Sequence, residues 1–227
     1  MLSSLNQRNK CCAVIPFYNE KKYLRSVVVS ALKFVDKVFA VDDGSYDDSY
    51  SEISGFKGVE IISLGKNYGK GYALQTGFNE AVNQNFDFII TLDGDNQHDP
   101  GFIPDFISGL KDYDIIIGNR LNDIKKMPFQ RILSNKITSL LLSLRTGNRI
   151  LDSQCGFRAY RSKVLKSVKT TFYGYEAESE MILLSAKKNF SIGFVSISTI
   201  YGDEESKMKP LNAIKGFLEV YFKHLNN

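Results

Sequence analysis

The stretch FDFIITLDGDNQHDP, residues 86–100, joins an apolar run to a polar end. Its first part, Phe86–Leu92, is short and rich in Phe and Ile, which predicts a buried β-strand. The carboxylates of Asp93 and Asp95 follow on either side of a glycine, and Gln97 adds an amide oxygen. Mg²⁺ and Mn²⁺ prefer such oxygen ligands, so the spacing indicates a divalent metal site. Ordinary turn chemistry is the alternative, since Asp, Gly and Asn are common in loops.

Three further apolar runs precede this strand, and each also ends in a polar or glycine-rich segment. The runs are Cys11–Phe17, Lys37–Val41 and Val59–Leu64, and the segments are 16–20, 42–45 and 65–70. Helical stretches at about 20–34, 47–54 and 71–85 separate the runs. Apolar strands that alternate with helices predict a mostly parallel α/β sheet covered on both faces. We expect the polar segments to meet at one edge, where open α/β folds bind ligands.

The rest of the chain continues this pattern less regularly. We expect strands over Asp114–Ile117 and Ile192–Ile200, and helices over 102–110, Pro128–Arg145, Glu176–Lys188 and Leu211–Leu225. The last of these helices is amphipathic. No repeat, linker or change of composition divides the chain, so we predict a single domain over residues 1–227.

The composition excludes several classes of protein. The chain has 227 residues, of which 43% are hydrophobic, and a formal charge of +4. No apolar run is long enough for a transmembrane span, and the polar segment 1–10 lacks the apolar core of a secretory signal. The charge is too small for a general nucleic-acid binder, and two histidines argue against a His-rich zinc site. Three cysteines without a CxxC pair favour a reducing, cytoplasmic setting.

The segments after the second and third strands each allow two interpretations. Asp42 and Asp43 can accept hydrogen bonds from a base or ribose, or can shape the turn before the next helix. Lys66 lies in the glycine- and lysine-rich run Gly65–Gly71, which could hold an anionic ligand or form a solvated basic loop. The run is not a Walker A sequence, because only three residues separate its first two glycines. We include Asp42, Asp43 and Lys66 among the candidate nucleotide-binding residues.

Four segments, taken in order, resemble the motifs of family 2 glycosyltransferases of GT-A fold, and within them the dolichyl- or polyprenyl-phosphate sugar synthases. The segments are Val14–Glu20, Val41–Ser45, Asn67–Gly71 and Asp93–Pro100. Weaker similarities follow at 118–120, 152–158, 175–178 and 206–207. The resemblance implies a Rossmann-like α/β fold with a nucleotide-sugar-binding half over 11–120. Residues 121–227 would then form the acceptor-side half, including the amphipathic C-terminal helix.

The same resemblance implies an inverting sugar transfer from a GDP- or UDP-linked donor and gives roles to individual residues. It implies that the nucleoside pocket is lined by Pro16, Tyr18, Glu20 and Asp43, with Asp42 nearby. It implies that Asp93 faces the ribose and diphosphate, while Asp95 and Gln97 hold Mg²⁺ or Mn²⁺ together with Asp93. It also implies that Arg120, Arg131 and Lys207 offer positive charge to donor or acceptor phosphates.

The acceptor decides whether such an enzyme needs a general base. A polyprenyl or dolichyl phosphate is already an anion and needs cations to position it. A sugar hydroxyl must lose a proton, which Glu178 could take, with Glu176 and Asp152 as further options. The alternative role of the two glutamates is to pair with the dipole at the start of a helix. We therefore expect the catalytic group to comprise Asp93, Asp95, Glu178 and Arg120.

Two other functions compete with sugar transfer. A nucleotidyltransferase usually has a glycine-rich basic loop near its N-terminus, where this chain has residues 16–20, PFYNE. A non-catalytic nucleotide-sugar sensor is expected to lack one metal carboxylate, and both are present. The last helix packs on the core, contacts the cytoplasmic face of a membrane or forms an oligomer contact. Lys209, Lys215 and Lys223 flank its apolar side, as in helices that lie at a membrane surface.

Overall fold

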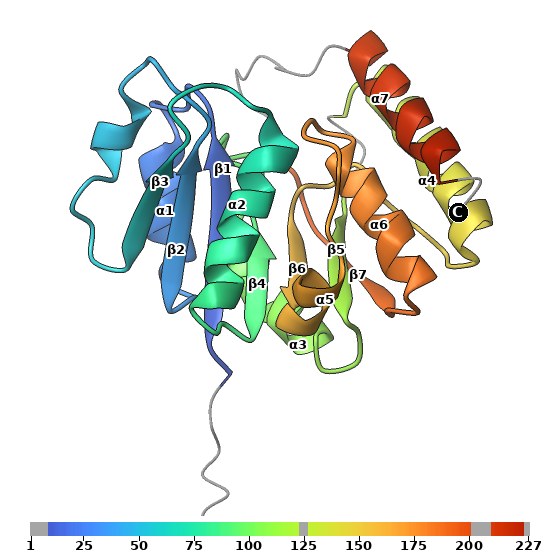
Figure 1. Cartoon of the computed structure of the whole chain (residues 1–227), viewed down its shortest axis with the longest axis horizontal. Helices are drawn as coiled ribbons and strands as arrows, with labels where there is room; N and C mark the ends of the chain where they lie inside the picture. The colour runs from blue at the N-terminus through green and yellow to red at the C-terminus, as the bar shows by residue number, and fades with distance from the viewer. Residues whose placement is uncertain (1–8, 123–126, 201–209, 225–227) are drawn as a thin grey trace, which may run out of the picture.

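A seven-stranded sheet forms the centre of the computed structural model, which describes residues 9–122, 127–200 and 210–224 (Figure 1). The strands are β1 Cys11–Phe17, β2 Lys37–Asp42, β3 Val59–Ser63, β4 Phe88–Thr91, β5 Ile115–Asn119, β6 Arg158–Arg161 and β7 Ile192–Ser196. Their order across the sheet is β3-β2-β1-β4-β6-β5-β7. Every neighbouring pair is parallel except the two pairs that β6 makes. The mostly parallel α/β sheet expected from the sequence is confirmed.

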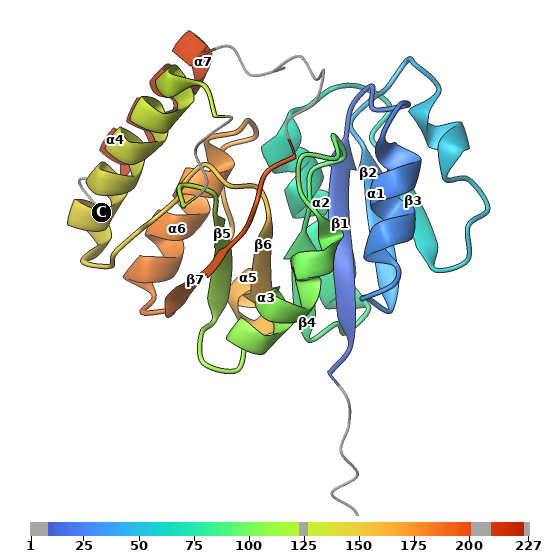
Figure 2. The same ribbon diagram turned by 180° about the vertical axis from the view of Figure 1, so that it is seen from behind.

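Helices cover both faces of this sheet. They are α1 Leu24–Ala31, α2 Lys70–Asn83, α3 Ile103–Gly109, α4 Phe129–Thr146, α5 Ser162–Ser167, α6 Ala177–Lys187 and α7 Pro210–Lys223, with short 3-10 turns at Ser49–Glu52 and Pro100–Phe102. Figures 1 and 2 show α2, α5 and α6 on one face and α1 and α3 on the other. The helices α4 and α7 lie at the end of the molecule farthest from β3. Among the residues described, no helix combines the length and apolar character needed to cross a bilayer.

The first four strands form as predicted because their apolar side chains pack into the core, although β3, at the edge of the sheet, is only partly buried. All seven residues of β1 are buried, and so are all four of β4. The register sets Phe17 beside Asp42, and Val14 beside Thr91. The carboxyl ends of β1, β2 and β4 therefore adjoin one another, with the polar segments of the sequence directly beyond them.

The structure differs from the sequence-based expectation mainly around β6. This strand and α5 were not predicted, because two of the four residues of β6 are arginines, which are usual on a surface. Arg158 is nevertheless 1% exposed, since its guanidinium donates to the carbonyl oxygens of Cys155, Glu178 and Ser153 at 2.7–2.8 Å. The first helix also begins at Leu24 rather than Glu20, and the last strand ends at Ser196.

Candidate active site

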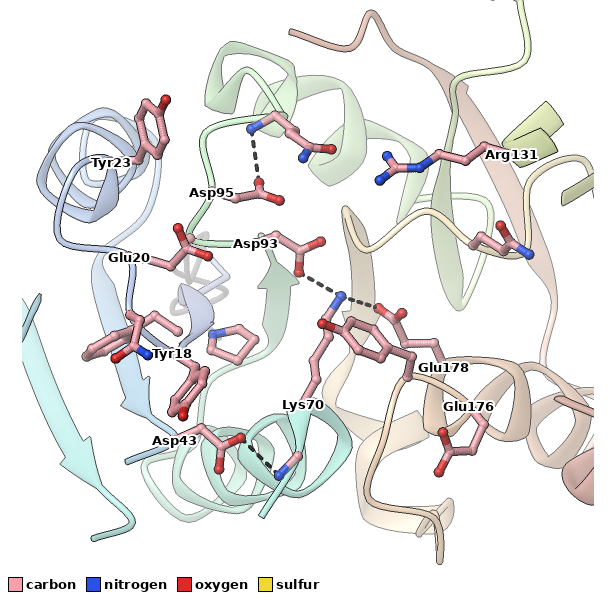
Figure 3. A pocket seen from close by; sticks show the side chains of 18 of the residues that line it. Tyr18, Glu20, Tyr23, Asp43, Lys70, Asp93, Asp95, Arg131, Glu176 and Glu178 are labelled. Atoms are coloured by element: carbon pink, nitrogen blue, oxygen red, sulfur yellow. Dashed lines mark hydrogen bonds and ion pairs between the residues drawn. The ribbon is translucent and has the colours of Figure 1, made fainter. Parts of the chain in front are cut away.

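A cleft of about 910 Å³ lies where the carboxyl ends of β1, β2 and β4 meet the C-terminal half of the chain (Figure 3). Many of the residues singled out in the sequence line it: Pro16, Tyr18, Glu20, Asp43, Asp93, Asp95, Gln97, Arg120, Arg131, Glu176 and Glu178. The fold thus gathers residues from both halves of the sequence around one cavity. Lys207 lies outside the described residues.

Two of the candidate nucleotide-binding residues, Asp42 and Lys66, do not line this cleft. Asp42 is buried, and its carboxylate accepts a hydrogen bond from the Ser45 N–H at 2.8 Å. It therefore takes the turn-forming role that was the alternative. The Lys66 ammonium lies 4.9 Å from the centre of the Tyr68 ring. The placement of these two side chains gives no support to a direct contact with a ligand in the cleft.

Asp43 is held at the edge of the cleft by the loop that follows β3. Its carboxylate accepts hydrogen bonds from the backbone N–H groups of Tyr68 at 2.7 Å and Gly69 at 2.9 Å. Burial raises the pKa of Asp43, and these two donors oppose the rise. The clamp fixes the loops after β2 and β3 relative to each other, so the wall of the cleft is formed before any ligand arrives.

Gly44 makes this clamp possible, and its replacement by alanine is expected to be costly. Its φ is +81°, and a Cβ there would lie 2.6 Å from the Cα of Lys66 and 2.7 Å from the nitrogen of Asn67. We expect Gly44→Ala to lower the free energy of unfolding by about 2–4 kcal/mol, measured by urea denaturation. Gly55→Ala is the matched control, because Gly55 has a φ of +76° but no atom within 4 Å of the added Cβ. Equal losses in the two variants would contradict the steric explanation.

Lys70 lies between two carboxylates on the floor of the cleft. Its Nζ is 2.7 Å from Oδ1 of Asp93 and 3.1 Å from Oε1 of Glu178, as the dashed lines in Figure 3 show. Burial alone lowers the pKa of Lys70, but the two negative charges outweigh it and raise the pKa above its ordinary value. The sequence signal was the glycine- and lysine-rich run around Lys70, for which an anion-binding loop and a solvated basic loop were both open. The lysine instead binds two acidic side chains, and Lys70 rather than Lys66 faces the cleft.

Asp95 lies in surroundings that disfavour the ionised form of its carboxyl group. Its Oδ1 accepts a hydrogen bond from the Gln97 N–H at 3.0 Å. Burial, followed by the charges of Asp93 and Glu20, raises the pKa of Asp95 to about 7. An added cation would relieve the repulsion that Asp95 meets from these neighbouring carboxylates.

The described residues contain no group of three or more His, Cys, Asp or Glu side chains placed to hold a metal ion. The candidate metal site therefore offers two carboxylates, from Asp93 and Asp95, and the amide of Gln97. Mg²⁺ commonly binds through one or two carboxylates and completes its shell with water and substrate phosphates. The residues present fit a cation that binds together with a diphosphate ligand.

Arg120 and Asp152 form an ion pair between the cleft and the core. The Arg120 guanidinium donates from Nε at 2.8 Å and from a terminal nitrogen at 2.9 Å, and Asn135 donates to the same carboxylate at 2.6 Å. Asp152 is fully buried. The carboxylate of Asp152 already accepts hydrogen bonds from Arg120 and Asn135 in the interior. Asp152 therefore does not fit the role of general base that was considered for it.

Arg131 reaches the cleft from the side opposite Tyr18 and Asp43. Figure 3 shows its guanidinium pointing into the cavity from α4. Within the described part of the chain, no carboxylate forms an ion pair with Arg131. The cleft thus has a mainly acidic side, formed by the strand ends, and a cationic group facing it from the C-terminal half.

Comparison with known proteins gives similarities over most of the chain. The model of the family described as glycosyl transferase family 2 matches residues 12–169. A UDP-N-acetylglucosamine–dolichyl-phosphate N-acetylglucosaminyltransferase of Methanococcus voltae is 30% identical, over 92% of this chain and 92% of its own length. An uncharacterized protein of Methanocaldococcus jannaschii is 33% identical, over 97% of this chain and 94% of its own.

Two further proteins are similar at lower sequence identity. An undecaprenyl-phosphate 4-deoxy-4-formamido-L-arabinose transferase of Proteus mirabilis is 27% identical, over 96% of this chain and 69% of its own. Among solved structures, glucosyl-3-phosphoglycerate synthase from Mycobacterium tuberculosis, with Mn²⁺, UDP and glucosyl-3-phosphoglycerate, has a TM-score of 0.74 at 19% identity. The match covers 96% of this chain and 80% of that one. At this identity the likeness concerns the fold alone.

Proposed function

Because the chain belongs to glycosyl transferase family 2 and is a glycosyltransferase of GT-A fold, we propose that it moves a sugar from a nucleoside diphosphate to the phosphate of a polyprenyl-type lipid. The observation that carries the proposal is the single cleft in which Asp43, Asp93 and Asp95 lie across from Arg131. Family membership counts against the nucleotidyltransferase alternative. The relative from Methanococcus voltae carries both a UDP-sugar and a dolichyl phosphate in its name, so UDP is the nucleotide we favour over GDP.

We assign the nucleoside to the side of the cleft formed by the β1 and β2 loops. Pro16, Tyr18, Glu20 and Asp43 line this side. The two loops are tied together, since the N–H of Asn19 donates to the Ser45 hydroxyl at 3.0 Å and the N–H of Glu20 donates to the Ser49 hydroxyl at 2.8 Å. A rigid wall with a buried carboxylate suits a planar base and a ribose, whose N–H and O–H groups can donate to it.

We assign a divalent cation, Mg²⁺ or Mn²⁺, to Asp93, Asp95 and Gln97. When bound, such an ion neutralises negative charge that develops on the departing diphosphate. Lys70 holds the Asp93 carboxylate at 2.7 Å and so keeps it ionised at neutral pH. Asp95, with its raised pKa, is the carboxylate whose ionisation the cation would favour most.

We assign the acceptor phosphate to Arg131, with Arg120 in support. The guanidinium of Arg131 has no carboxylate partner among the described residues, whereas the charge of Arg120 is shared with Asp152. In the transfer, an oxygen of the acceptor phosphate forms a bond to C1 of the sugar. The bond from C1 to the nucleoside diphosphate breaks, and the configuration at C1 inverts. The acceptor is already an anion, so the step needs no general base.

One observation favours a second candidate function, transfer to a sugar hydroxyl. Glu178 lines the cleft, is 8% exposed and lies at the start of α6, where it could accept a proton. One of the two carboxylate oxygens of Glu178, Oε1, already forms an ion pair with Lys70 at 3.1 Å. Under the leading proposal Glu178 keeps Lys70 in place and does not take a proton.

The experiment that tests the proposal compares acceptors that differ by one group. UDP- and GDP-linked sugars are offered with Mn²⁺ to a short polyprenyl phosphate, and to the corresponding polyprenol without phosphate. We expect transfer to the lipid phosphate and none to the polyprenol, because Arg131 can bind only the former through its charge. Transfer to the polyprenol at a similar rate, or only to free sugars, would contradict the lipid-phosphate acceptor.

A further inference from the structure

The helix α4 is apolar on its outside and polar on its inside. Its outward face carries five apolar side chains that are between 48% and 74% exposed; we call Phe129, Leu133, Ile137, Leu140 and Leu144 the α4 stripe. The spacing of three or four residues places them along one side of the helix. The buried face holds polar Asn135, Thr138 and Ser139, next to Leu142.

This arrangement is the reverse of an ordinary surface helix, whose apolar side faces the core. The buried polar groups are satisfied within the protein: Asn135 donates to Asp152 at 2.6 Å, and the hydroxyls of Thr138 and Ser139 lie 2.9 Å and 3.0 Å from that of Ser153. The orientation of α4 is therefore fixed by hydrogen bonds, and its stripe is left facing outward. A row of large exposed apolar side chains marks a surface that contacts a lipid bilayer or another protein.

The charges around the stripe indicate which of these the surface contacts. Residues 127–149 contain Arg131, Lys136, Arg145 and Arg149 and no Asp or Glu. Lys136 and Arg149 are exposed. A second copy of the chain docked through this helix in a symmetric pair would set like charges against each other. An anionic lipid bilayer matches both features, because its headgroups attract the cations and its acyl chains accept the apolar stripe.

The helix that carries the stripe also forms part of the cleft wall. Met127, two residues before α4 begins, lines the cleft, as do Arg131, Asn135 and Thr138 within the helix. The neighbouring α7 is joined to α4 where Arg145 donates to the carbonyl of His224, and it exposes three more apolar residues along one side, Ile214, Leu218 and Phe222.

We propose that the α4 stripe, together with the exposed apolar side of α7, lies on the surface of an anionic lipid bilayer and holds the cleft at the membrane interface. The inference goes beyond the proposed activity, since it concerns a surface outside the cleft. It is tested by binding alone, without any sugar transfer, so its failure and that of the proposed function can be told apart.

The test measures co-sedimentation with vesicles of phosphatidylcholine and phosphatidylglycerol, and with vesicles of phosphatidylcholine alone. We expect the protein to bind the anionic vesicles more tightly than the neutral ones. In the double variant Leu140→Ser, Leu144→Ser, binding to anionic vesicles should weaken by about tenfold or more, because two exposed leucines no longer enter the lipid. Neither residue lines the cleft or contributes to the core.

The matched control is Val29→Ser, Tyr50→Ser, which removes two exposed apolar side chains from α1 and the 3-10 turn after β2. It should bind vesicles as the unchanged protein does, and both double variants should unfold at similar temperatures. The proposal is overturned if the unchanged protein fails to bind anionic vesicles or if the Leu140, Leu144 variant binds them equally well. It is also overturned if light scattering finds a dimer that this variant converts to a monomer.

Discussion

Replacing Asp95 by asparagine is expected to lower the rate of sugar transfer by about 10²- to 10³-fold while leaving the fold intact. Asparagine keeps the size of the side chain and can still accept the hydrogen bond from the Gln97 N–H. It removes the negative charge that the proposed cation needs. Because Asp95 resists ionisation in the cation-free protein, its loss relieves repulsion with Asp93 and should not destabilise the domain.

The raised pKa of Asp95, about 7, adds a pH dependence to this prediction. Below that pH the side chain is increasingly protonated, so the affinity of the unchanged protein for Mn²⁺ should fall as the pH is lowered. The Asp95→Asn variant should lack this dependence, because it has no proton to lose. Titration of Mn²⁺ in the presence of UDP, at several pH values, measures both effects.

Asp99→Asn is the matched control for Asp95→Asn. Asp99 is exposed, does not line the cleft, and accepts a hydrogen bond from the Gly101 N–H at 2.8 Å, which asparagine can also accept. The control should keep full activity and should lose it on addition of EDTA, as the unchanged protein does. Substantial transfer by Asp95→Asn, together with no effect of EDTA, would rule out the metal assignment.

Replacing Asp152 by asparagine is expected to lower the free energy of unfolding by about 3–5 kcal/mol. The substitution leaves the guanidinium of Arg120 without the carboxylate to which it donates at 2.8 Å and 2.9 Å. It also weakens the bond from Asn135, on the polar inner face of α4. Removing one partner of a buried pair is costly, because the remaining charge stays in a poorly solvated place.

The contribution of Asp152 to the free energy of unfolding should decrease as the pH is lowered. Burial raises the pKa of Asp152, but the charge and hydrogen bonds of Arg120 outweigh it, so the pKa in the folded protein lies below its ordinary value. The unfolded value is about 3.9. The stabilisation is therefore complete well above that pH and is lost as the pH falls below it, so the difference between the two proteins should narrow in acid.

Urea unfolding at neutral pH and below pH 4 measures this difference. Glu219→Gln is the control, since the Glu219–Lys215 pair spans 3.8 Å between side chains that are 53% and 79% exposed. An exposed pair contributes little, so the control should cost less than about 1 kcal/mol at any pH. A loss in Asp152→Asn no larger than in Glu219→Gln would show that the buried pair does not stabilise the fold.

Much of the fold could be predicted from local patterns. β1 and β4 consist of apolar residues that few other environments accept, and amphipathic helices separate them from their neighbours. The polar residues after each strand, among them Asp43 and Asp95, could be assigned to one edge because parallel strands end on the same side. β6 escaped prediction because Arg158 looks like a surface residue until its three carbonyl partners are known.

Apolar periodicity and turn chemistry act over a few neighbouring positions, so they were enough to predict every strand except β6, the edge of the sheet expected to bind ligands and the acidic residues placed there. Contacts between distant segments were needed to show that Lys70 binds Asp93 and Glu178, that Asp152 is the partner of Arg120, and that α4 turns its apolar side outward. These outcomes depend on which distant segments share a low-dielectric interior, where charges and hydrogen-bonding groups need partners. Amphipathic spacing shows that a helix has two faces, but the buried partners of Asn135 and Ser139 decide which face lies inside.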